Sequence, residues 1–248
     1  MKIFSIKKIM IAIFMVLIFY TLYWLFISSV FKSKITDSFA IYPSISYDSI
    51  SLKGFPYRMQ VEINNFNLKR DDKIKFDISS PIIKLDINPF DFNRLLLRSN
   101  IIEGNIVYEE LNLNVKLTEI RSTVLSSEDK IKEYLLIINN ADILVNELKI
   151  NAFKNIFFKI INIENFIYQL NTSAEGSGFI GSDDGQMKID LNGNYQIKNR
   201  NLEGNLQLTV TGADDNQILF NAPIQIKENT VFFLFLPILD LNSLLNFF

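Results

Sequence analysis

The stretch that decides the fold reads Met187-Lys188-Ile189-Asp190-Leu191-Asn192-Gly193-Asn194-Tyr195-Gln196-Ile197-Lys198. Apolar and polar side chains alternate in it with a period of two, which places them on opposite faces of an extended strand. After a short polar connection at 199–201, residues 202–210 repeat the pattern. Short connections join antiparallel neighbours, so the two stretches predict a long hairpin with one apolar and one polar face.

This alternation recurs along most of the chain beyond residue 56. It is clear over residues 57–63, 74–78, 83–87, 111–117 and 187–210. Strands of about twelve residues with short polar connections predict an antiparallel meander of roughly fourteen strands. Residues 131–170 stay ambiguous, because the apolar run within them fits a buried strand or a helix.

The apolar face of such a sheet has to be hidden from water. The sequence offers no run of amphipathic helices to cover it, so we expect the sheet to curl on itself. The predicted fold is mainly β: an N-terminal transmembrane helix followed by a long, curled antiparallel β-sheet, shaped as a half-barrel or groove. The candidate lining residues of the groove are Met59, Val61, Ile63, Met187, Ile189, Leu191, Leu206 and Leu208.

The N-terminal segment is predicted to anchor the chain in a membrane. Ile9 to Phe31 carries no charged residue and is bounded by Lys8 and Lys32. As a helix it would be roughly 34 Å long, enough for a hydrocarbon core of about 30 Å. A cleaved signal peptide is the alternative. Its apolar region is usually about 7–15 residues long and precedes an A-x-A-like site, and neither feature is present here.

The anchor divides the chain. Lysines are in mild excess before the helix, which favours an N-terminus inside the cell. The expected segments are a cytoplasmic tail at 1–8, the transmembrane helix at 9–31, a linker helix at 32–43 that Pro43 ends, and a β domain at 44–248 with an apolar C-terminal segment at 231–248.

Composition excludes several functions. Lys+Arg number 25 and Asp+Glu 27, without a basic stripe, so nucleic acid is not an expected partner. The chain has no cysteine and no histidine. Thiolate nucleophiles, cysteine-ligated zinc and the commonest general base are therefore missing. We expect no enzyme activity, no catalytic residue, no cofactor and no metal site.

Two polar patterns resemble sites, but turns explain both. Gly176 to Gly181 spells G-x-G-x-x-G, yet acidic residues follow it where a dinucleotide site needs a helix N-terminus. The acidic pairs Asp71-Asp72, Asp183-Asp184 and Asp214-Asp215 lie in polar stretches between strands. Neighbouring carboxylates in solvated turns rarely hold a cation.

The segment Gly54-Phe55-Pro56-Tyr57-Arg58 is the one distinctive motif. Its structural interpretation is the start of a strand, in which Gly54 allows an unusual φ, Pro56 fixes the next one and Phe55 plugs the core. Its functional interpretation is a rim element of the groove, with Arg58 facing a lipid phosphate. We favour the structural interpretation.

This motif, after a hydrophobic N-terminal helix and a short strand, resembles an uncharacterised alphaproteobacterial envelope family, domain of unknown function 2125. Residues 80–85, followed by a turn at Asn88-Pro89, agree with it. So does the segment 222–229, where Asn229 replaces the family's turn glycine and Pro237 follows the next apolar strand. Residues 83–117 are more loosely similar to AsmA-like proteins.

AsmA-like proteins are bilayer-anchored, have a groove-shaped periplasmic β domain and are implicated in envelope lipid homeostasis. The resemblance therefore implies the bacterial inner membrane, a periplasmic domain and a lipid-lined groove, with a phospholipid or other acyl lipid as partner besides the membrane itself. It supplies no catalytic residues. The alternative is a structural scaffold or assembly factor that binds envelope proteins and carries no lipid. An enzyme is a third, disfavoured hypothesis.

Overall fold

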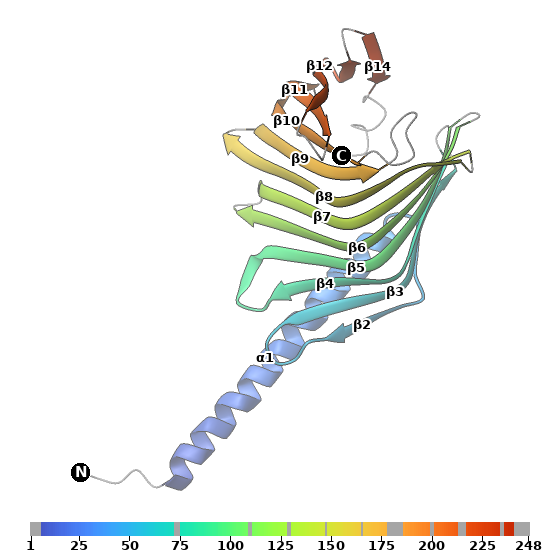
Figure 1. Cartoon of the computed structure of the whole chain (residues 1–248). Coiled ribbons are helices and arrows are strands. Elements are labelled where there is room, and N and C mark those ends of the chain that lie inside the picture. The colour runs from blue at the N-terminus through green and yellow to red at the C-terminus, as the bar shows by residue number, and fades with distance from the viewer. Residues whose placement is uncertain are drawn as a thin grey trace.

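The computed structural model describes residues 6–71, 75–108, 111–127, 130–146, 148–164, 166–177, 186–198, 201–212, 217–233 and 236–240. Within these residues the chain forms one long helix and one antiparallel β-sheet (Figure 1). The predicted mainly β fold with an N-terminal apolar helix is confirmed.

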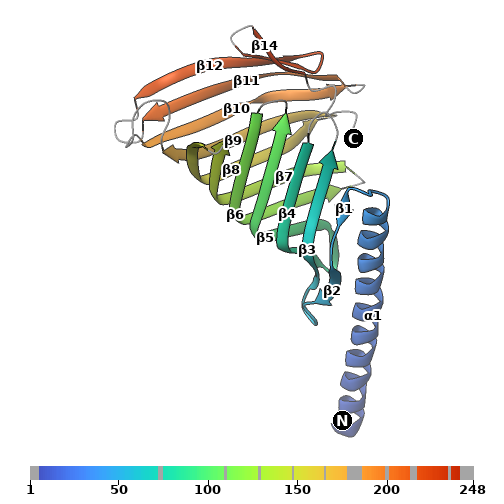
Figure 2. The same cartoon turned by 90° about the vertical axis from the view of Figure 1, so that its right-hand side faces the viewer.

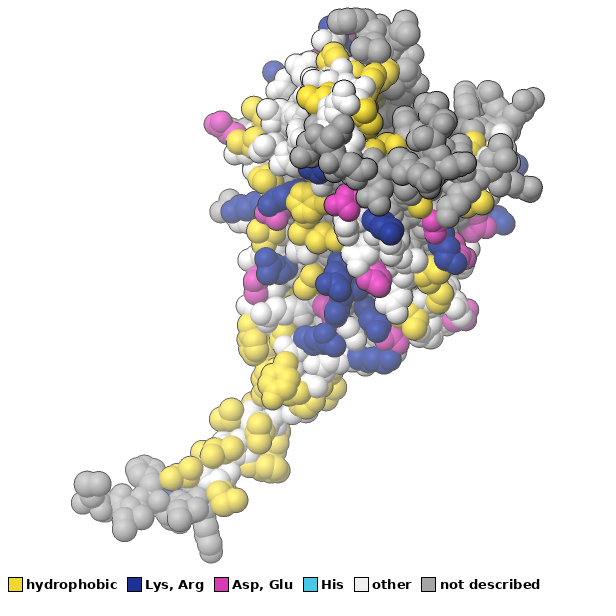
Figure 3. All heavy atoms as spheres, in the orientation of Figure 1, with side chains coloured by type: hydrophobic (Ala, Val, Ile, Leu, Met, Phe, Trp, Pro, Cys, Tyr) yellow, Lys and Arg dark blue, Asp and Glu magenta, His cyan; other side chains and the backbone are white. Residues whose placement is uncertain are grey.

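Helix α1 spans Ile6–Ala40. Over Lys8–Ala40 it is long and apolar enough to cross a membrane, judged by length and composition. Its N-terminal part extends away from the sheet as an apolar rod (Figures 1 and 3). The helix ends three residues before Pro43, whose ring disfavours helical backbone in the residue before it.

The strands are long, as the alternation predicts. Their bounds are β1 Ile45–Ser46, β2 Ser49–Lys53, β3 Met59–Asp71, β4 Lys75–Asn88, β5 Asp91–Tyr108, β6 Leu111–Ser127, β7 Lys130–Val145, β8 Leu148–Glu164, β9 Ile167–Ser177, β10 Gln186–Lys198, β11 Asn201–Gly212, β12 Ile218–Lys227, β13 Thr230–Phe233 and β14 Leu236–Asp240.

In the described part of the chain these strands form a single 14-stranded sheet. From β3 to β14 each strand pairs with the next one in the sequence, while β1 and β2 both pair with β3 at one edge. The sheet is long and open and does not close into a barrel (Figure 2). The ambiguous residues 131–170 belong to β7, β8 and β9, so the strand alternative is the right one.

A line of bends crosses β3 to β8 and folds the sheet into two arms (Figures 1 and 2). Along each strand the side chains of one face are two residues apart, except at the bend, where the spacing is three. The flanking pairs are Ile63 and Phe66, Ile83 and Ser80, Ser99 and Ile102, Ile120 and Leu117, Ile138 and Ala141, and Ile156 and Phe153. This extra residue keeps the same face apolar on both arms.

Left-handed backbone produces the bend. Asn65, Glu119 and Asn155 have φ values of 50°, 54° and 51° in β3, β6 and β8. The β3–β4 pairing skips Asn65 and Pro81, so a residue without an N–H is tolerated inside β4. Pro81 therefore lies within one bent strand, β4.

The face inside the bend carries the apolar side chains, and we call it the inner face. Ser80 Oγ and Ser99 Oγ meet across the bend at 2.8 Å, and both residues are buried. The outer side of the bend is exposed at Asn65 and Glu119. Side chains are crowded on the inside of a bend and spread apart on its outside. This difference identifies the face toward which the sheet bends.

Helix α1 packs on the inner face of the first strands. One cluster joins Trp24 to Met59 and Ile87. A second joins Ile50, Val61, Ile63 and Ile83 to partly buried helix residues, namely Phe31, Ile35 and Phe39. Within the segment predicted as a linker helix, 32–43, Ile35 and Phe39 therefore pack on the sheet.

Candidate functional site

An apolar row crosses the whole inner face. Directly paired residues of an antiparallel ladder present their side chains on the same face. Following the pairings from β3 to β13 gives the apolar row: Met59, Ile87, Leu95, Val124, Tyr134, Ile160, Leu170, Gly193, Leu206, Ile224 and Phe233. It begins against Trp24 of α1 and contains no charged residue.

A second row runs parallel to the apolar row on the same face, two residues away along each strand. Its members, from β3 to β12, are Val61, Leu85, Leu97, Ser122, Leu136, Phe158, Thr172, Leu191, Leu208 and Ala222. Together the two rows make a band that runs from the helix across the sheet and is apolar except at Ser122 and Thr172.

All the predicted lining residues lie on this inner face, but in two separate places. Met59, Val61 and Ile63 are buried beneath α1, which removes them from an open lining. No local signal in the sequence predicts this cover, because an apolar run of this length is typical of a membrane anchor.

The remaining lining residues lie far from α1, on β10 and β11. Leu206 and Met187 are buried, and Leu206 packs with Leu170 and Ile226. Ile189, Leu191 and Leu208 are half-buried. The part of the inner face that can still receive apolar groups is therefore the half-buried part around these three residues.

Two half-buried tyrosines lie side by side on the inner face of β9 and β10. The rings of Tyr168 and Tyr195 stack there with centroids 5.5 Å apart. Burial, with a smaller contribution from Tyr168, raises the pKa of Tyr195 to about 12. The shift follows from the partial burial of the Tyr195 ring, because burial disfavours the ionised phenol.

The distinctive motif forms a tight turn between β2 and β3. Gly54 has φ 94°, and the Arg58 backbone N–H donates to the Gly54 carbonyl at 3.0 Å. A Cβ on Gly54 would lie 2.7 Å from the Arg58 carbonyl oxygen, so glycine is required there. Phe55 does not plug the core, contrary to the prediction. It is half exposed and packs edge-on against Trp24, with centroids 5.3 Å apart.

Three α1 side chains bond to backbone carbonyls of this turn and of the neighbouring β4–β5 turn. The Tyr20 hydroxyl donates to the Pro56 carbonyl. Trp24 Nε1 donates to the Arg58 carbonyl at 3.2 Å, and the Tyr23 hydroxyl donates to Pro89 at 2.9 Å. We call residues 54–58 and 88–92 the docked turns.

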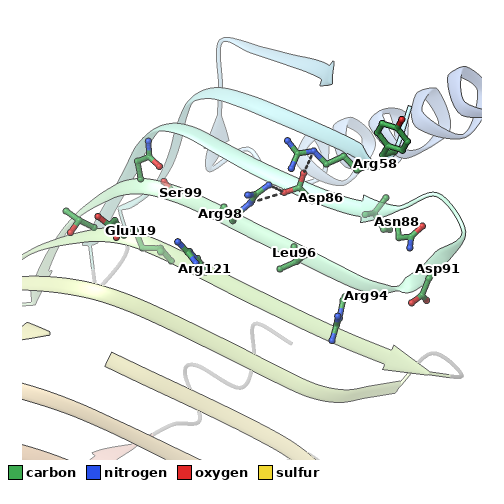
Figure 4. A pocket seen from close by; sticks show the side chains of 15 residues that line it. Arg58, Asp86, Asn88, Asp91, Arg94, Leu96, Arg98, Ser99, Glu119 and Arg121 are labelled. Carbon is green, nitrogen blue, oxygen red and sulfur yellow. Dashed lines mark hydrogen bonds and ion pairs between the residues drawn. The ribbon is translucent and has the colours of Figure 1, made fainter. Parts of the chain in front are cut away.

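A hollow of about 1150 Å³ lies on the outer face beside the docked turns. Arg58, Arg94, Arg98 and Arg121 line it together with Asp86 (Figure 4). Basic side chains gather on this face of the sheet (Figure 3). The sequence does not reveal this cluster, because its members come from the turn before β3 and from β4, β5 and β6.

Asp86 organises the hollow. It is a buried carboxylate that accepts from Arg98 Nε at 2.9 Å and from Gln60 Nε2 at 2.8 Å. Arg58 Nε lies 3.9 Å from it, which gives Arg58 the partner that the sequence did not reveal. Arg94 and Arg121 are exposed and make no ion pair with another described residue.

The other polar patterns give no site in the described residues. No group of acidic side chains suited to a metal ion is found among them. Asp71 pairs with Lys75 at 2.7 Å, and this contact lowers the pKa of its carboxyl. Gly176 is a buried residue of β9 facing Phe153. Residues 72, 178–185, 213–216 and 241–248, which hold the rest of these motifs and most of the apolar tail, lie outside the described residues.

No protein-family model, no curated protein and no solved structure matches this chain. The class of protein is therefore defined by its architecture: a helix of membrane-spanning length docked on an open, bent antiparallel sheet with an apolar inner face. The resemblance to the alphaproteobacterial family and to AsmA-like proteins stays a prediction.

Proposed function

We propose that this chain is a non-enzymatic, single-pass protein of the bacterial inner membrane whose periplasmic sheet shelters lipid acyl chains on its inner face. The observation that carries the proposal is the apolar row, unbroken from Met59 beside α1 to Phe233 on β13. Only an apolar occupant gains free energy by contact with such a band.

The free energy gained by such contact is sufficient to bind an acyl chain. Burial of apolar surface contributes about 25 cal/mol per Å², so an acyl chain that hides a few hundred Å² gains several kcal/mol. The half-buried residues Ile189, Leu191 and Leu208 are the expected contact region, since α1 already covers the opposite end.

The test measures phospholipid that copurifies with the detergent-extracted full chain. Leu208→Glu places a carboxylate on the inner face, and the control Gln207→Glu places one on the outer face of the same strand. We expect Leu208→Glu to lower the bound lipid per chain and Gln207→Glu to leave it unchanged. Far-UV circular dichroism checks that both variants keep the sheet.

Equal lipid content in both variants and the parent would contradict the proposal. The lipid would then be only that held around α1, and the scaffold alternative would become the better account of the sheet.

A further inference from the structure

The docked turns contact a part of α1 that lies within the hydrocarbon core when the helix spans a membrane. Starting from Ile9, a straight helix reaches Tyr20 after about 17 Å and Trp24 after about 23 Å. The hydrocarbon core of a bilayer is about 30 Å thick, and tilting the helix leaves both residues still deeper. Tyr20 and Trp24 nevertheless contact the sheet.

The exposed side chains of these turns suit such a place. Phe55 is 51% exposed, Tyr57 89%, Phe90 70% and Phe92 52%. Phe90 stacks on Tyr20 and on Tyr23, with ring centroids 6.0 and 6.2 Å apart. Clustered exposed aromatic residues mark an interaction surface, and aromatic rings are enriched at membrane–water interfaces.

The backbone of the docked turns provides a second, independent observation. Irregular backbone is tolerated at membrane depth only where its polar groups are satisfied within the protein. The carbonyls of Pro56, Arg58 and Pro89 are the ones that accept hydrogen bonds from Tyr20, Trp24 and Tyr23. The helix thus satisfies these carbonyls within the protein, as a location at membrane depth requires.

The arginines at and beside the docked turns also favour a location in the membrane. Arg58 and Arg94 belong to the outer-face hollow whose lining also includes Tyr57 and Asn88. Arginine binds lipid phosphates well, and its long side chain reaches them from backbone that lies below their level.

We propose that the docked turns, with Phe55, Tyr57, Phe90 and Phe92, insert into the interface of the leaflet that faces the β domain. The partner is the phospholipid bilayer itself. This inference rests on the single-pass anchor of the proposed function but not on lipid held by the inner face. The insertion fixes the near end of the apolar row against the bilayer.

The absence of natural cysteine allows a clean test. The full chain with Tyr57→Cys, Phe90→Cys, Phe166→Cys or Val16→Cys is labelled with an environment-sensitive fluorophore and reconstituted in vesicles of phosphatidylethanolamine and phosphatidylglycerol. Phe166 is the matched control. It is an exposed aromatic residue in the β8–β9 turn, on the same side of the sheet but four strands farther on, about 19 Å away. Val16 reports on the anchor.

A nitroxide carried on the lipid acyl chain is expected to quench most of the fluorescence at positions 57 and 90, as at position 16, and to leave position 166 bright. Iodide in the water should give the reverse order. Phe92→Cys replaces either turn variant if its circular dichroism departs from that of the parent.

If positions 57 and 90 behave like 166 while 16 is quenched from the lipid, the turns lie in water and the inference is wrong, although the anchor stands. If position 16 also escapes lipid quenching, the anchor fails, and the proposed function fails with it.

Discussion

At the scale of single residues, glycines mark where strands of the inner face come closest. Gly204 lies opposite Tyr195, and a Cβ on it would be 2.6 Å from the Tyr195 Cβ. Gly204 is the centre of Leu202-Glu203-Gly204-Asn205-Leu206, and Gly104 is the centre of the nearly identical Ile102-Glu103-Gly104-Asn105-Ile106. A Cβ on Gly104, however, would meet nothing closer than 3.9 Å. The same local sequence therefore has two different steric settings.

We predict that Gly204→Ala destabilises the chain by about 1–3 kcal/mol, because the β10 backbone has to move to admit the methyl group. Gly104→Ala should be neutral or slightly stabilising, by up to about 1 kcal/mol, since alanine restricts the unfolded chain. Denaturant unfolding in detergent, followed by circular dichroism, measures both. Similar midpoints for the two variants would contradict the assigned contacts.

At the scale of the strand, the bend depends on backbone that most residues avoid. Glu119 has a φ of 54°, in the left-handed region that glycine and asparagine adopt more readily than glutamate does. Its carboxylate accepts a hydrogen bond from Asn139, the facing residue of β7. Glu103 of β5 is an exposed glutamate in ordinary extended backbone and is paired with Lys116 at 3.1 Å.

We predict opposite responses at these two glutamates. Glu119→Gly should stabilise the chain by up to about 1 kcal/mol and Glu119→Val should destabilise it by about 1–3 kcal/mol, since a β-branched residue is strained at positive φ. At Glu103, valine should be tolerated and glycine should destabilise. The same order of valine and glycine at both positions, in thermal unfolding, would show that β6 does not bend at residue 119.

At the scale of the whole molecule, alternation predicted the long strands, their antiparallel order and their single apolar face, because each depends on neighbours in sequence. Asparagine at turn positions was also informative: Asn229, where the resembling family has glycine, has φ 64° in the turn between Lys227 and Thr230.

The position of α1 could not be predicted in the same way. Trp24 and Phe31 read as membrane residues, and only the folded sheet shows that they pack on Met59, Ile87 and the strands beside them. The hollow around Asp86 was missed for a similar reason, since its partners Gln60 and Arg98 come from different strands. Contacts between segments that are far apart in the sequence produce no periodic pattern within either segment.

The most direct test of acyl-chain binding places a photoreactive amino acid at Ile189, on the half-buried inner face of β10, with Lys188 on the outer face as its control. After irradiation of native membranes, the account predicts phospholipid adducts at position 189 and few or none at 188. Absence of lipid adducts at 189, or equal yields at both positions, would contradict it.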